Sequence, residues 1–209
     1  KGVVGIVASR LIENHYKPTI VLAEKDGILT GSARSVHDFD LYSAIAKCAH
    51  LCEKFGGHKY AAGLSIKKEN LAQFIDEFEK AVSESITEDQ LTPKINIDKV
   101  IDIDEVDDKL YRIINQFSPF GPKNLSPIFV SKAVVDNGYG KQVGADKTHL
   151  RINAKRSNDS IAGIGFGMGD FFENIKDNQT FDVCYSIDEN EWNGRKTLQL
   201  RLRDLKPNS

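Results

Sequence analysis

A polar stretch at residues 83–93 constrains the fold most, because the apolar residues follow different patterns before and after it. The stretch contains the run TEDQ and ends at Pro93. Polar segments that carry few apolar side chains are typical of the boundary between two domains. We therefore expect two domains, one at residues 1–86 and one at residues 94–209, in a chain of mixed α+β class.

The first part of the chain alternates between helical and extended patterns. Apolar residues recur at helical spacing near the start, and this helix should end before Pro18, since the residue preceding a proline avoids helical angles. The continuous apolar run at residues 19–23 predicts a strand that is covered on both faces. A turn signal separates it from a partner strand at residues 28–33.

Two more helices are expected in the same domain. The apolar residues within residues 41–55 indicate an amphipathic helix, and Gly56 and Gly57 are expected to end it. Another helix is expected to begin at Asn70, with Gln73 placed to complete a capping box. Helices and strands in this order predict an α/β domain.

The second part of the chain shows mostly strand patterns. In its last segment, leucines alternate with polar and charged residues, so that one face is buried and the other is exposed. One helix, capped by Asp104, is expected near the start of this part. The strand-like segments are residues 95–103, 128–135, 149–154, 160–166, 181–187 and 196–205. Several short strands with one early helix favour a small Greek-key β-barrel of the OB type.

Composition argues against several classes of protein. The formal net charge of −2 disfavours a protein that wraps a long duplex, because neutralising many phosphates takes many cations. No apolar run approaches the roughly 20 residues needed to cross a bilayer, and no secretory leader opens the chain. Cys48, Cys52 and nearby His50 lack the second half of a zinc site. We therefore expect a cytoplasmic protein that binds no metal and no membrane.

Two short motifs carry chemistry, GSARS at residues 31–35 and FGGHKYAAG at residues 55–63. Arg34 offers a planar fork of donors that suits a phosphate group. A tight glycine turn beside His58 frees backbone N–H groups, which together can hold an oxyanion. The residues alone leave a second interpretation open, in which the glycines only end a helix and Arg34 and His58 are ordinary surface residues.

The same motifs resemble those of a known superfamily. GSARS followed by FGGHKYAAG is similar to the DHH-associated domain, the partner of DHH phosphoesterase domains. The opening GVVGIVASRL is similar to the segment that follows the catalytic domain in RecJ-like exonucleases, and residues 119–124 and 127–129 resemble the entry into their OB domain. The resemblance covers nearly the whole chain, and it departs at Lys123, where a second glycine is expected.

This resemblance implies the C-terminal, substrate-binding part of a 5′→3′ exonuclease that is specific for single-stranded DNA and acts in DNA repair and recombination. The manganese or magnesium ions of such an enzyme lie in an N-terminal DHH domain, its expected partner, whose motifs are not found in this sequence. This part alone is therefore expected to bind no cofactor and to be inactive. The resemblance assigns phosphate or DNA contacts to Arg34, His58, Gly56, Gly57, Ser32 and Ser35.

Two other functions fit the DHH-associated motifs. One is a phosphodiesterase that acts on short oligonucleotides or cyclic dinucleotides, and the other is a non-catalytic nucleic-acid-binding module. An OB barrel argues against the phosphodiesterase, because a nucleotide-sized substrate does not need a surface that holds a strand.

An OB barrel binds single strands through aromatic platforms and a basic groove. The candidates of these types in the second part are Lys123, Tyr139, Lys141, Lys147, His149, Arg151, Lys155, Arg156, Trp192, Arg195 and Lys196. Each of them could equally be a solvated surface residue. The glycine-rich residues 163–169 are interpreted as a strand and turn, since no βαβ unit surrounds them. The acidic residues 102–108 are interpreted as a helix start and not as a calcium loop.

Overall fold

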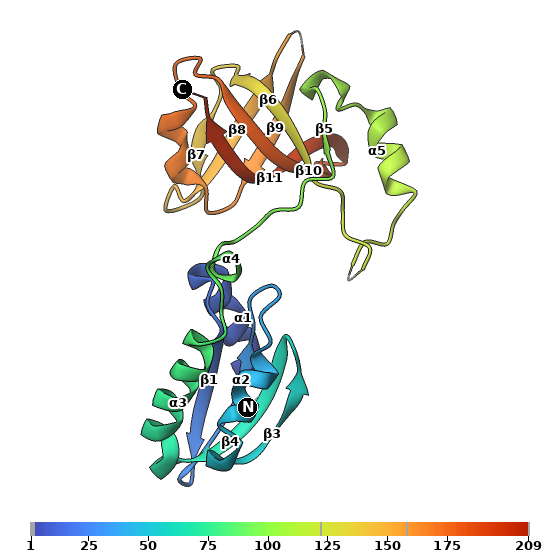
Figure 1. The fold of residues 1–209 in the computed structure, drawn as a ribbon. Coiled ribbons are helices and arrows are strands. Elements are labelled where there is room, and N and C mark those ends of the chain that lie inside the picture. Colours follow the sequence, from blue (N-terminus) through green and yellow to red (C-terminus); the bar gives the residue numbers. More distant parts are fainter. Residues whose placement is uncertain (1–2, 122, 158, 209) are drawn as a thin grey trace. The chain divides into compact units, whose positions relative to one another are not determined.

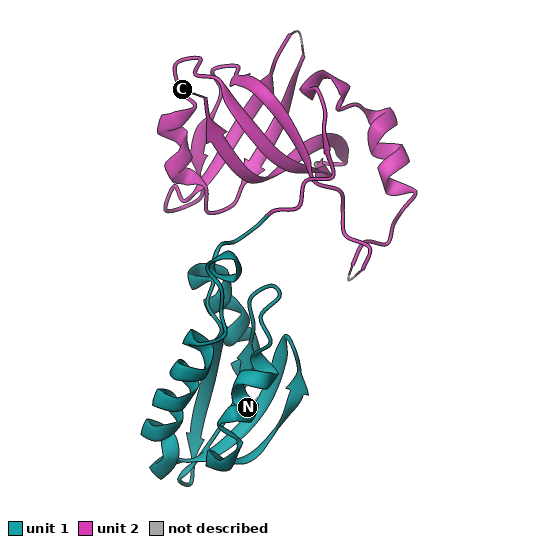
Figure 2. Ribbon diagram, in the orientation of Figure 1, with its two compact units in different colours: residues 1–94 teal, residues 95–209 magenta. Residues whose placement is uncertain are grey.

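The computed structural model describes residues 3–121, 123–157 and 159–208, and of Trp192 it describes only the backbone. The chain divides into two compact units, unit 1 (Lys1–Lys94) and unit 2 (Ile95–Ser209), which Figure 2 shows in different colours. The polar stretch at residues 83–93 lies at the end of unit 1 and contains the short helix α4 (Glu88–Leu91). Gln90 Nε2 donates a hydrogen bond of 2.9 Å to the backbone oxygen of Asp38, which fixes this helix to unit 1.

Unit 1 is built on a four-stranded antiparallel sheet with the strand order β1-β2-β4-β3 (Figure 1). Its strands are β1 (Thr19–Lys25), β2 (Ile28–Arg34), β3 (Cys52–His58) and β4 (Ala61–Lys67). Alternate residues of β2 and β4 are buried, among them Ala33 and Leu64. They form one core with Ile45 of α2 (Leu41–Lys47) and Phe74 of α3 (Leu71–Ser83). Helix α1 (Val4–His15) contacts β1 and β2.

Two of the predictions for unit 1 are wrong. The helix expected at residues 41–55 ends at Lys47, and β3 begins at Cys52 after the short η1 (Ala49–Leu51). The chain leaves the helix early because residues 52–58 pair with β4, which buries Leu64 between two strands. The capping box at Asn70 is absent, since its side chain donates to the backbone oxygen of Leu51 and Gln73 bonds to Glu77.

Unit 2 is a β-barrel in which the strand pairings close on themselves. Antiparallel pairings join β6 to β8, β8 to β9, β11 to β10 and β10 to β6, and a parallel pairing joins β9 to β11. This is the strand order of a five-stranded Greek-key barrel of the OB type. The five strands are β6 (Phe129–Asp136), β8 (His149–Lys155), β9 (Ser160–Gly165), β10 (Phe181–Trp192) and β11 (Arg195–Pro207). The expected OB barrel is confirmed, and the glycine-rich residues 163–169 belong to β9, the turn after it and the first residue of η4 (Gly169–Asn174).

Shorter elements decorate the barrel. The two-residue strand β5 (Lys99–Val100) runs parallel to β6. Strand β7 (Lys141–Val143), which was not expected from the sequence, pairs with β8. Asp104 does not cap the helix α5 (Asp108–Asn115), as was expected. The cap is Asp107, whose Oδ1 accepts from the backbone N–H of Leu110 at 2.7 Å. Asp102 caps the preceding η3 (Ile103–Glu105), so the acidic run starts two short helices in succession.

A pair of polar side chains lies in the barrel interior. Ser131 and Tyr185 are both fully buried, and their hydroxyl groups lie 2.7 Å apart. Ser131 Oγ also donates to the backbone oxygen of Ile101 at 3.0 Å, so the Tyr185 hydroxyl is the donor in the shared bond. Burial raises the pKa of Tyr185 to about 12, and the phenol therefore keeps its proton at neutral pH.

Removing Ser131 should destabilise unit 2 more than removing the hydroxyl of Tyr185. Ser131→Ala leaves the buried Tyr185 hydroxyl without its partner and should cost about 1–3 kcal/mol. Tyr185→Phe leaves Ser131 bonded to Ile101 and should cost about 1 kcal/mol. Urea unfolding of the two variants measures the difference, and a Tyr185→Phe variant that is the less stable of the two would contradict this assignment of donor and acceptor.

Candidate functional site

Arg34 and His58 lie in one row across the sheet of unit 1. Arg34 of β2 is paired with Ala61 of β4, and Ala61 is paired with His58 of β3. Residues that are directly opposite each other point to the same face of a sheet, so the two side chains flank the small Ala61 on one face. Their Cα atoms are separated by two strand spacings, about 10 Å, and both side chains can reach a ligand that lies between them.

The guanidinium of Arg34 lies against the first turn of α1. Arg34 Nη1 donates to Ser32 Oγ at 2.7 Å and to the backbone oxygen of Ala33 at 2.9 Å. A Cβ atom on Gly5 would lie 2.9 Å from Arg34 Nη2, so a glycine at this position lets the helix and the guanidinium approach each other. The amino end of a helix carries partial positive charge, and an anion bound here would therefore interact favourably with both groups.

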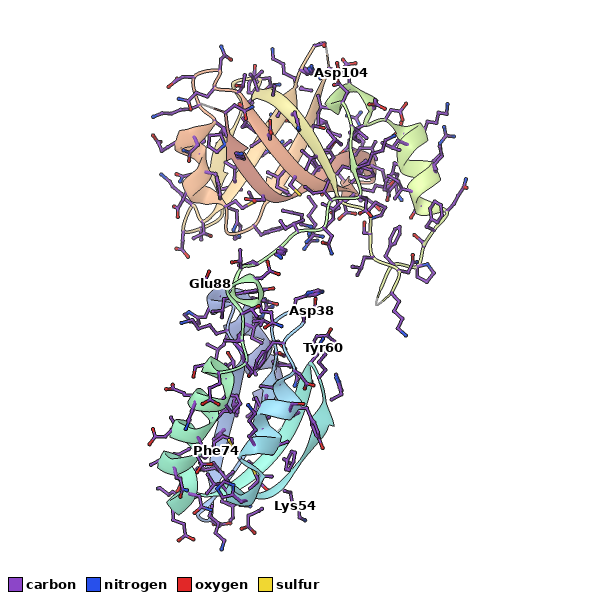
Figure 3. The ribbon with its side chains drawn as sticks, viewed as in Figure 1. Asp38, Lys54, Tyr60, Phe74, Glu88 and Asp104 are labelled. Carbon is purple, nitrogen blue, oxygen red and sulfur yellow. The ribbon has the colours of Figure 1, made fainter. Side chains whose placement is uncertain are left out.

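His58 is exposed at the end of β3, and a backbone contact fixes the position of its proton. Its Nδ1 accepts from the backbone N–H of Tyr60 at 3.3 Å, and the neutral ring therefore carries its proton on Nε2. The ring is also edge-on to Tyr60 at 6.5 Å. Figure 3 shows Tyr60 at the same end of unit 1 as Asp38, which accepts from the Tyr60 hydroxyl, whereas Lys54 lies at the opposite end. His58 thus offers one oriented N–H donor beside Ala61.

Gly56 and Gly57 do not end a helix, contrary to the expectation from sequence, and they have different roles within β3. Gly57 has a φ of 150°, and a Cβ on it would lie 2.3 Å from the backbone oxygen of Ala61, so no side chain fits there. Gly56 is paired with Gly63 of β4, and no heavy atom lies within 4 Å of the position that its Cβ would take. Gly63 is in turn paired with Ser32. The sheet face next to the Arg34–His58 row is therefore bare backbone.

The two serines of the GSARS motif differ in their surroundings. Ser32 Oγ accepts from Arg34 and holds the guanidinium in place. Ser35 Oγ donates to the backbone oxygen of Phe39 at 2.8 Å, and its backbone N–H donates to that of Tyr60 at 3.0 Å. Ser35 thus connects the loop after β2 to the β3–β4 hairpin.

In unit 2, three cationic side chains lie in one row on the outside of the barrel. Lys141 of β7 is paired with Arg151 of β8, Arg151 with Ile164 of β9, and Ile164 with Arg201 of β11. The neighbouring residues Leu150 and Leu200 are buried, so the row lies on the outer face. Lys141, Arg151 and Arg201 are all exposed. We call Lys141, Arg151 and Arg201, together with Ile164 between the two arginines, the cationic row.

An exposed aromatic residue lies beside the cationic row. Phe166 directly follows β9 and is 58% exposed. The guanidinium of Arg201 lies 5.5 Å from the centre of its ring, and the ring of His149 is edge-on to it at 5.2 Å. His149 Nδ1 accepts from the backbone N–H of Gly167 at 3.1 Å, which fixes the turn that carries Phe166. Phe166 and Arg201 were not among the candidates from sequence, although the alternation of β11 already placed Arg201 on its exposed face.

The remaining candidates are distributed over other parts of unit 2. Arg156 is bonded to Asp102 at 2.5 Å and Lys196 to Glu189 at 2.6 Å, so both cations are already paired. Arg195 opens β11, next to Trp192, whose side chain lies outside the described residues. Lys155 ends β8, whereas Lys147 and Tyr139 lie in exposed turns. Lys123 has a φ of 70° in the turn closed by Gly121 and Asn124, a left-handed conformation that explains why a glycine was expected there.

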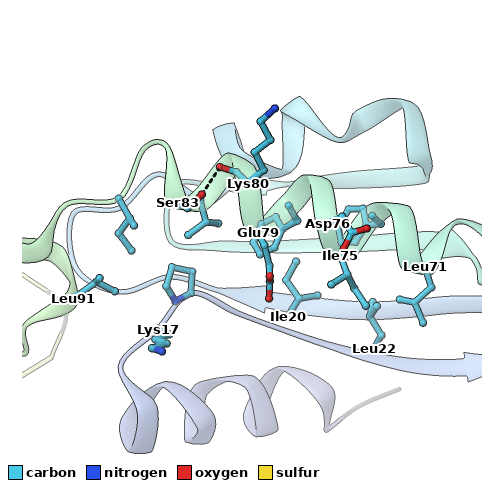
Figure 4. A pocket seen from close by; sticks show the side chains of 15 residues that line it. Lys17, Ile20, Leu22, Leu71, Ile75, Asp76, Glu79, Lys80, Ser83 and Leu91 are labelled. Carbon is cyan, nitrogen blue, oxygen red and sulfur yellow. Dashed lines mark hydrogen bonds between the residues drawn. The ribbon is translucent and has the colours of Figure 1, made fainter.

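The thiol of Cys48 and the mainly apolar groove beside α3 do not have the chemistry of a phosphate-binding site. Burial raises the pKa of Cys48 to about 11, which leaves it protonated and unreactive at neutral pH. A groove of about 810 Å³ lies between α3 and β1, and Figure 4 shows its apolar lining, which includes Ile20, Leu22 and Ile75.

Within residues 3–121, 123–157 and 159–208, no three His, Cys, Asp or Glu side chains come together to hold a metal ion. No helix in the same residues is long and apolar enough to cross a membrane.

Comparison with models of known protein families gives one match for each of the two units. The family model of the DHHA1 domain matches residues 1–84, and that of the RecJ OB domain matches residues 97–204, more than half of the chain. The chain belongs to the RecJ family. The resemblance inferred from the GSARS and FGGHKYAAG motifs is thereby confirmed.

Individual members of the RecJ family match along almost the entire chain. The single-stranded-DNA-specific exonuclease RecJ of Bacillus subtilis is 33% identical over 97% of this chain, and that of Haemophilus influenzae is 28% identical over 99%. This chain spans 26% and 37% of the lengths of these two relatives. The crystal structures of Thermus thermophilus RecJ with Mn²⁺ and with Mg²⁺ cover 100% of the chain with TM-scores of 0.79 and 0.75, at 22% and 21% identity, and share its fold.

Proposed function

We propose that this chain is the substrate-binding part of a 5′→3′ exonuclease that degrades single-stranded DNA in DNA repair and recombination. The observation that carries the proposal is the cationic row beside the exposed ring of Phe166. The row crosses β8 and β9, the second and third strands of the barrel, and this is the face with which OB folds bind oligonucleotides. Cations that follow a phosphate backbone beside a ring that stacks on a base suit a single strand of any sequence.

The two units have different roles in this proposal. The cationic row of unit 2 holds the length of the strand, whereas Arg34 and His58 of unit 1 hold one phosphate group. A guanidinium fork and an oriented imidazole N–H match phosphate oxygens and read no base edge, so these contacts position the strand without selecting a sequence. The bare backbone at Gly56 and Gly63 leaves room for the sugar next to that phosphate.

Bond cleavage is assigned to another part of the same protein. The described residues do not fit a catalytic metal ion, since they contain no cluster of three ligands. The solved relatives with Mn²⁺ and Mg²⁺ support a divalent ion in the complete protein. We assign it to an N-terminal DHH domain, the partner of unit 1, in a cytoplasmic protein whose cysteines Cys48, Cys52 and Cys184 are unpaired.

Binding should favour single strands and should weaken with salt. For a labelled oligothymidylate, the logarithm of affinity should fall with the logarithm of salt concentration by about 0.7 per phosphate contacted. Arg201→Gln should reduce this slope by about 0.7, because it removes one phosphate contact. Lys109→Gln removes the same charge from α5, which is not part of the row, and should leave the slope unchanged. Fluorescence anisotropy measures both, and equal affinity for duplex or a slope of zero would rule out this binding mode.

The length of the bound oligonucleotide separates this function from the phosphodiesterase alternative. A surface that follows a strand gains phosphate contacts as the strand lengthens, so affinity should rise from dinucleotides to longer oligonucleotides. A phosphodiesterase for cyclic dinucleotides would instead bind a dinucleotide as tightly as a long strand. The row across β7, β8, β9 and β11 favours the first outcome.

A further inference from the structure

The loop between β6 and β7 is held by hydrogen bonds at every backbone N–H group. The N–H of Asn137 donates to the backbone oxygen of Asn153 at 3.0 Å, and that of Tyr139 donates to Asn137 Oδ1 at 3.2 Å. The N–H groups of Gly138 and Gly140 donate to the carboxylate of Asp136 at 2.8 and 2.7 Å. Four consecutive N–H groups are thus occupied, and the loop has none to offer to an anion.

Asp136 is the residue around which this loop is built. It is the last residue of β6, is only 6% exposed, and receives a third bond on Oδ1 from the backbone N–H of Asn153 at 2.7 Å. Burying a carboxylate is costly unless its oxygens accept hydrogen bonds, and here three backbone donors meet it. A Cβ on Gly140 would lie 2.9 Å from both carboxylate oxygens, so the loop fits closely around this side chain.

Tyr139 is what this ordered loop presents to solvent. Tyr139 is 74% exposed, although the backbone on either side is fixed. A single exposed aromatic residue needs no explanation by itself. Here the backbone that carries the ring is already fixed, so the loop loses little conformational freedom when the ring stacks on a base. Lys141 follows two residues later and begins the cationic row.

We infer that Asp136 is a positioning residue, which holds the loop so that Tyr139 stacks on a base of the single strand bound along the cationic row. This inference rests on the proposed function and adds a second aromatic platform to Phe166. Tyr139 makes the contact, and Asp136 acts only through it. Stacking on a ring does not depend on the identity of the base, in keeping with binding of any sequence.

The first test measures the binding of labelled oligothymidylate to the complete protein. Tyr139→Ala should weaken binding about tenfold, in the range found for removing one stacked base. Tyr139→Phe and Tyr139→Trp should restore it, since the ring and not the hydroxyl makes the contact. Leu125→Ala is the matched control, because Leu125 is 77% exposed in the same unit but is not part of this loop. A Tyr139→Ala variant that binds like the wild type overturns the inference.

The second test separates positioning from a general structural role. Asp136→Asn and Gly140→Ala should each lower affinity about as much as Tyr139→Ala, and neither should lower it further in a Tyr139→Ala background. Gly140→Ala disturbs the loop without changing charge, and it decides the question if Asp136→Asn fails to fold. Losses that multiply in the double variants would show that Asp136 does not act through Tyr139.

In these experiments, failure of this inference and failure of the proposed function give different results. If the wild type does not prefer single strands and Arg201→Gln has no effect, the proposed function fails, and the inference fails with it. If Arg201→Gln weakens binding whereas the loop variants do not, only the role of Asp136 and Tyr139 is wrong.

Discussion

Replacing Arg34 by alanine in the complete protein should lower the turnover of single-stranded DNA by about 100-fold or more, on every sequence alike. Arg34 is held by Ser32 and Ala33 and lies against the first turn of α1, where its remaining donors can grip a phosphate. Without this grip the scissile bond is no longer fixed, and misplacement by about 1 Å can cost on the order of 100-fold in rate. Steady-state kinetics on homopolymers of different bases measures the loss.

His58→Ala provides the internal control for this prediction. If Arg34 and His58 hold the same phosphate across Ala61, the double variant should lose less activity than the product of the two single losses. Neither side chain belongs to the buried core, so the melting temperature should stay near that of the wild type. Near-full activity of both single variants, or a loss that follows unfolding, would show that the row does not hold the phosphate.

Gly57→Ala should destabilise unit 1 by about 3 kcal/mol or more, whereas Gly56→Ala should leave its stability almost unchanged. At Gly57 a Cβ meets the backbone oxygen of Ala61 at 2.3 Å and the Cα of Ala62 at 2.6 Å, and the φ of 150° strains any other residue. Backbone strain and overpacking each cost about 1–3 kcal/mol. At Gly56 the Cβ would point into open space. The melting temperature of unit 1 should fall by roughly 10 °C or more for Gly57→Ala.

For Gly56→Ala, the informative measurement is the turnover of DNA. Gly56→Ala places a methyl group on the bare backbone beside the Arg34–His58 row, and it should reduce the turnover of DNA without unfolding the protein. Gly63→Ala, on the paired strand, should behave in the same way, because the nearest atom to its Cβ is a backbone oxygen at 3.8 Å. If both variants keep full activity, the substrate does not approach this part of the sheet.

The sequence predicted the barrel of unit 2 better than the sheet of unit 1. Leu198, Leu200 and Leu202 alternate over a long strand, and such a pattern has few interpretations. In β3 the apolar residues Cys52 and Phe55 continue the helical spacing of α2, while its glycines carry no side chain that could show which face is buried. The pairing with β4 decides the structure there, and that pairing is not local. The alternation of Ala62, Leu64 and Ile66 was a signal that could have identified β4.

Only part of the candidate site could be predicted, again because the strand pairings that assemble it are not local in sequence. Arg34 and His58 were singled out from their motifs, but their common row depends on the register of β4 between them. Lys141 and Arg151 were candidates by residue type alone. Phe166 and Arg201 come together only through the parallel pairing of β9 with β11, which joins segments far apart in the chain. No pattern within a short stretch of sequence could have predicted the contact between Phe166 and Arg201.

Closure of the barrel also has a consequence for the order in which unit 2 folds. The β10–β11 hairpin and the β8–β9 pair connect neighbouring segments and can form early, because closing a short loop costs little entropy. Contacts between β9 and β11, and between β6 and β10, must wait until these pieces meet. Arg201 comes into one row with Arg151 only when β9 pairs with β11. In a partly folded barrel, the cations of the row are therefore not yet aligned. Affinity for a single strand should therefore appear during refolding together with the slowest, cooperative phase, and not with the early hairpins.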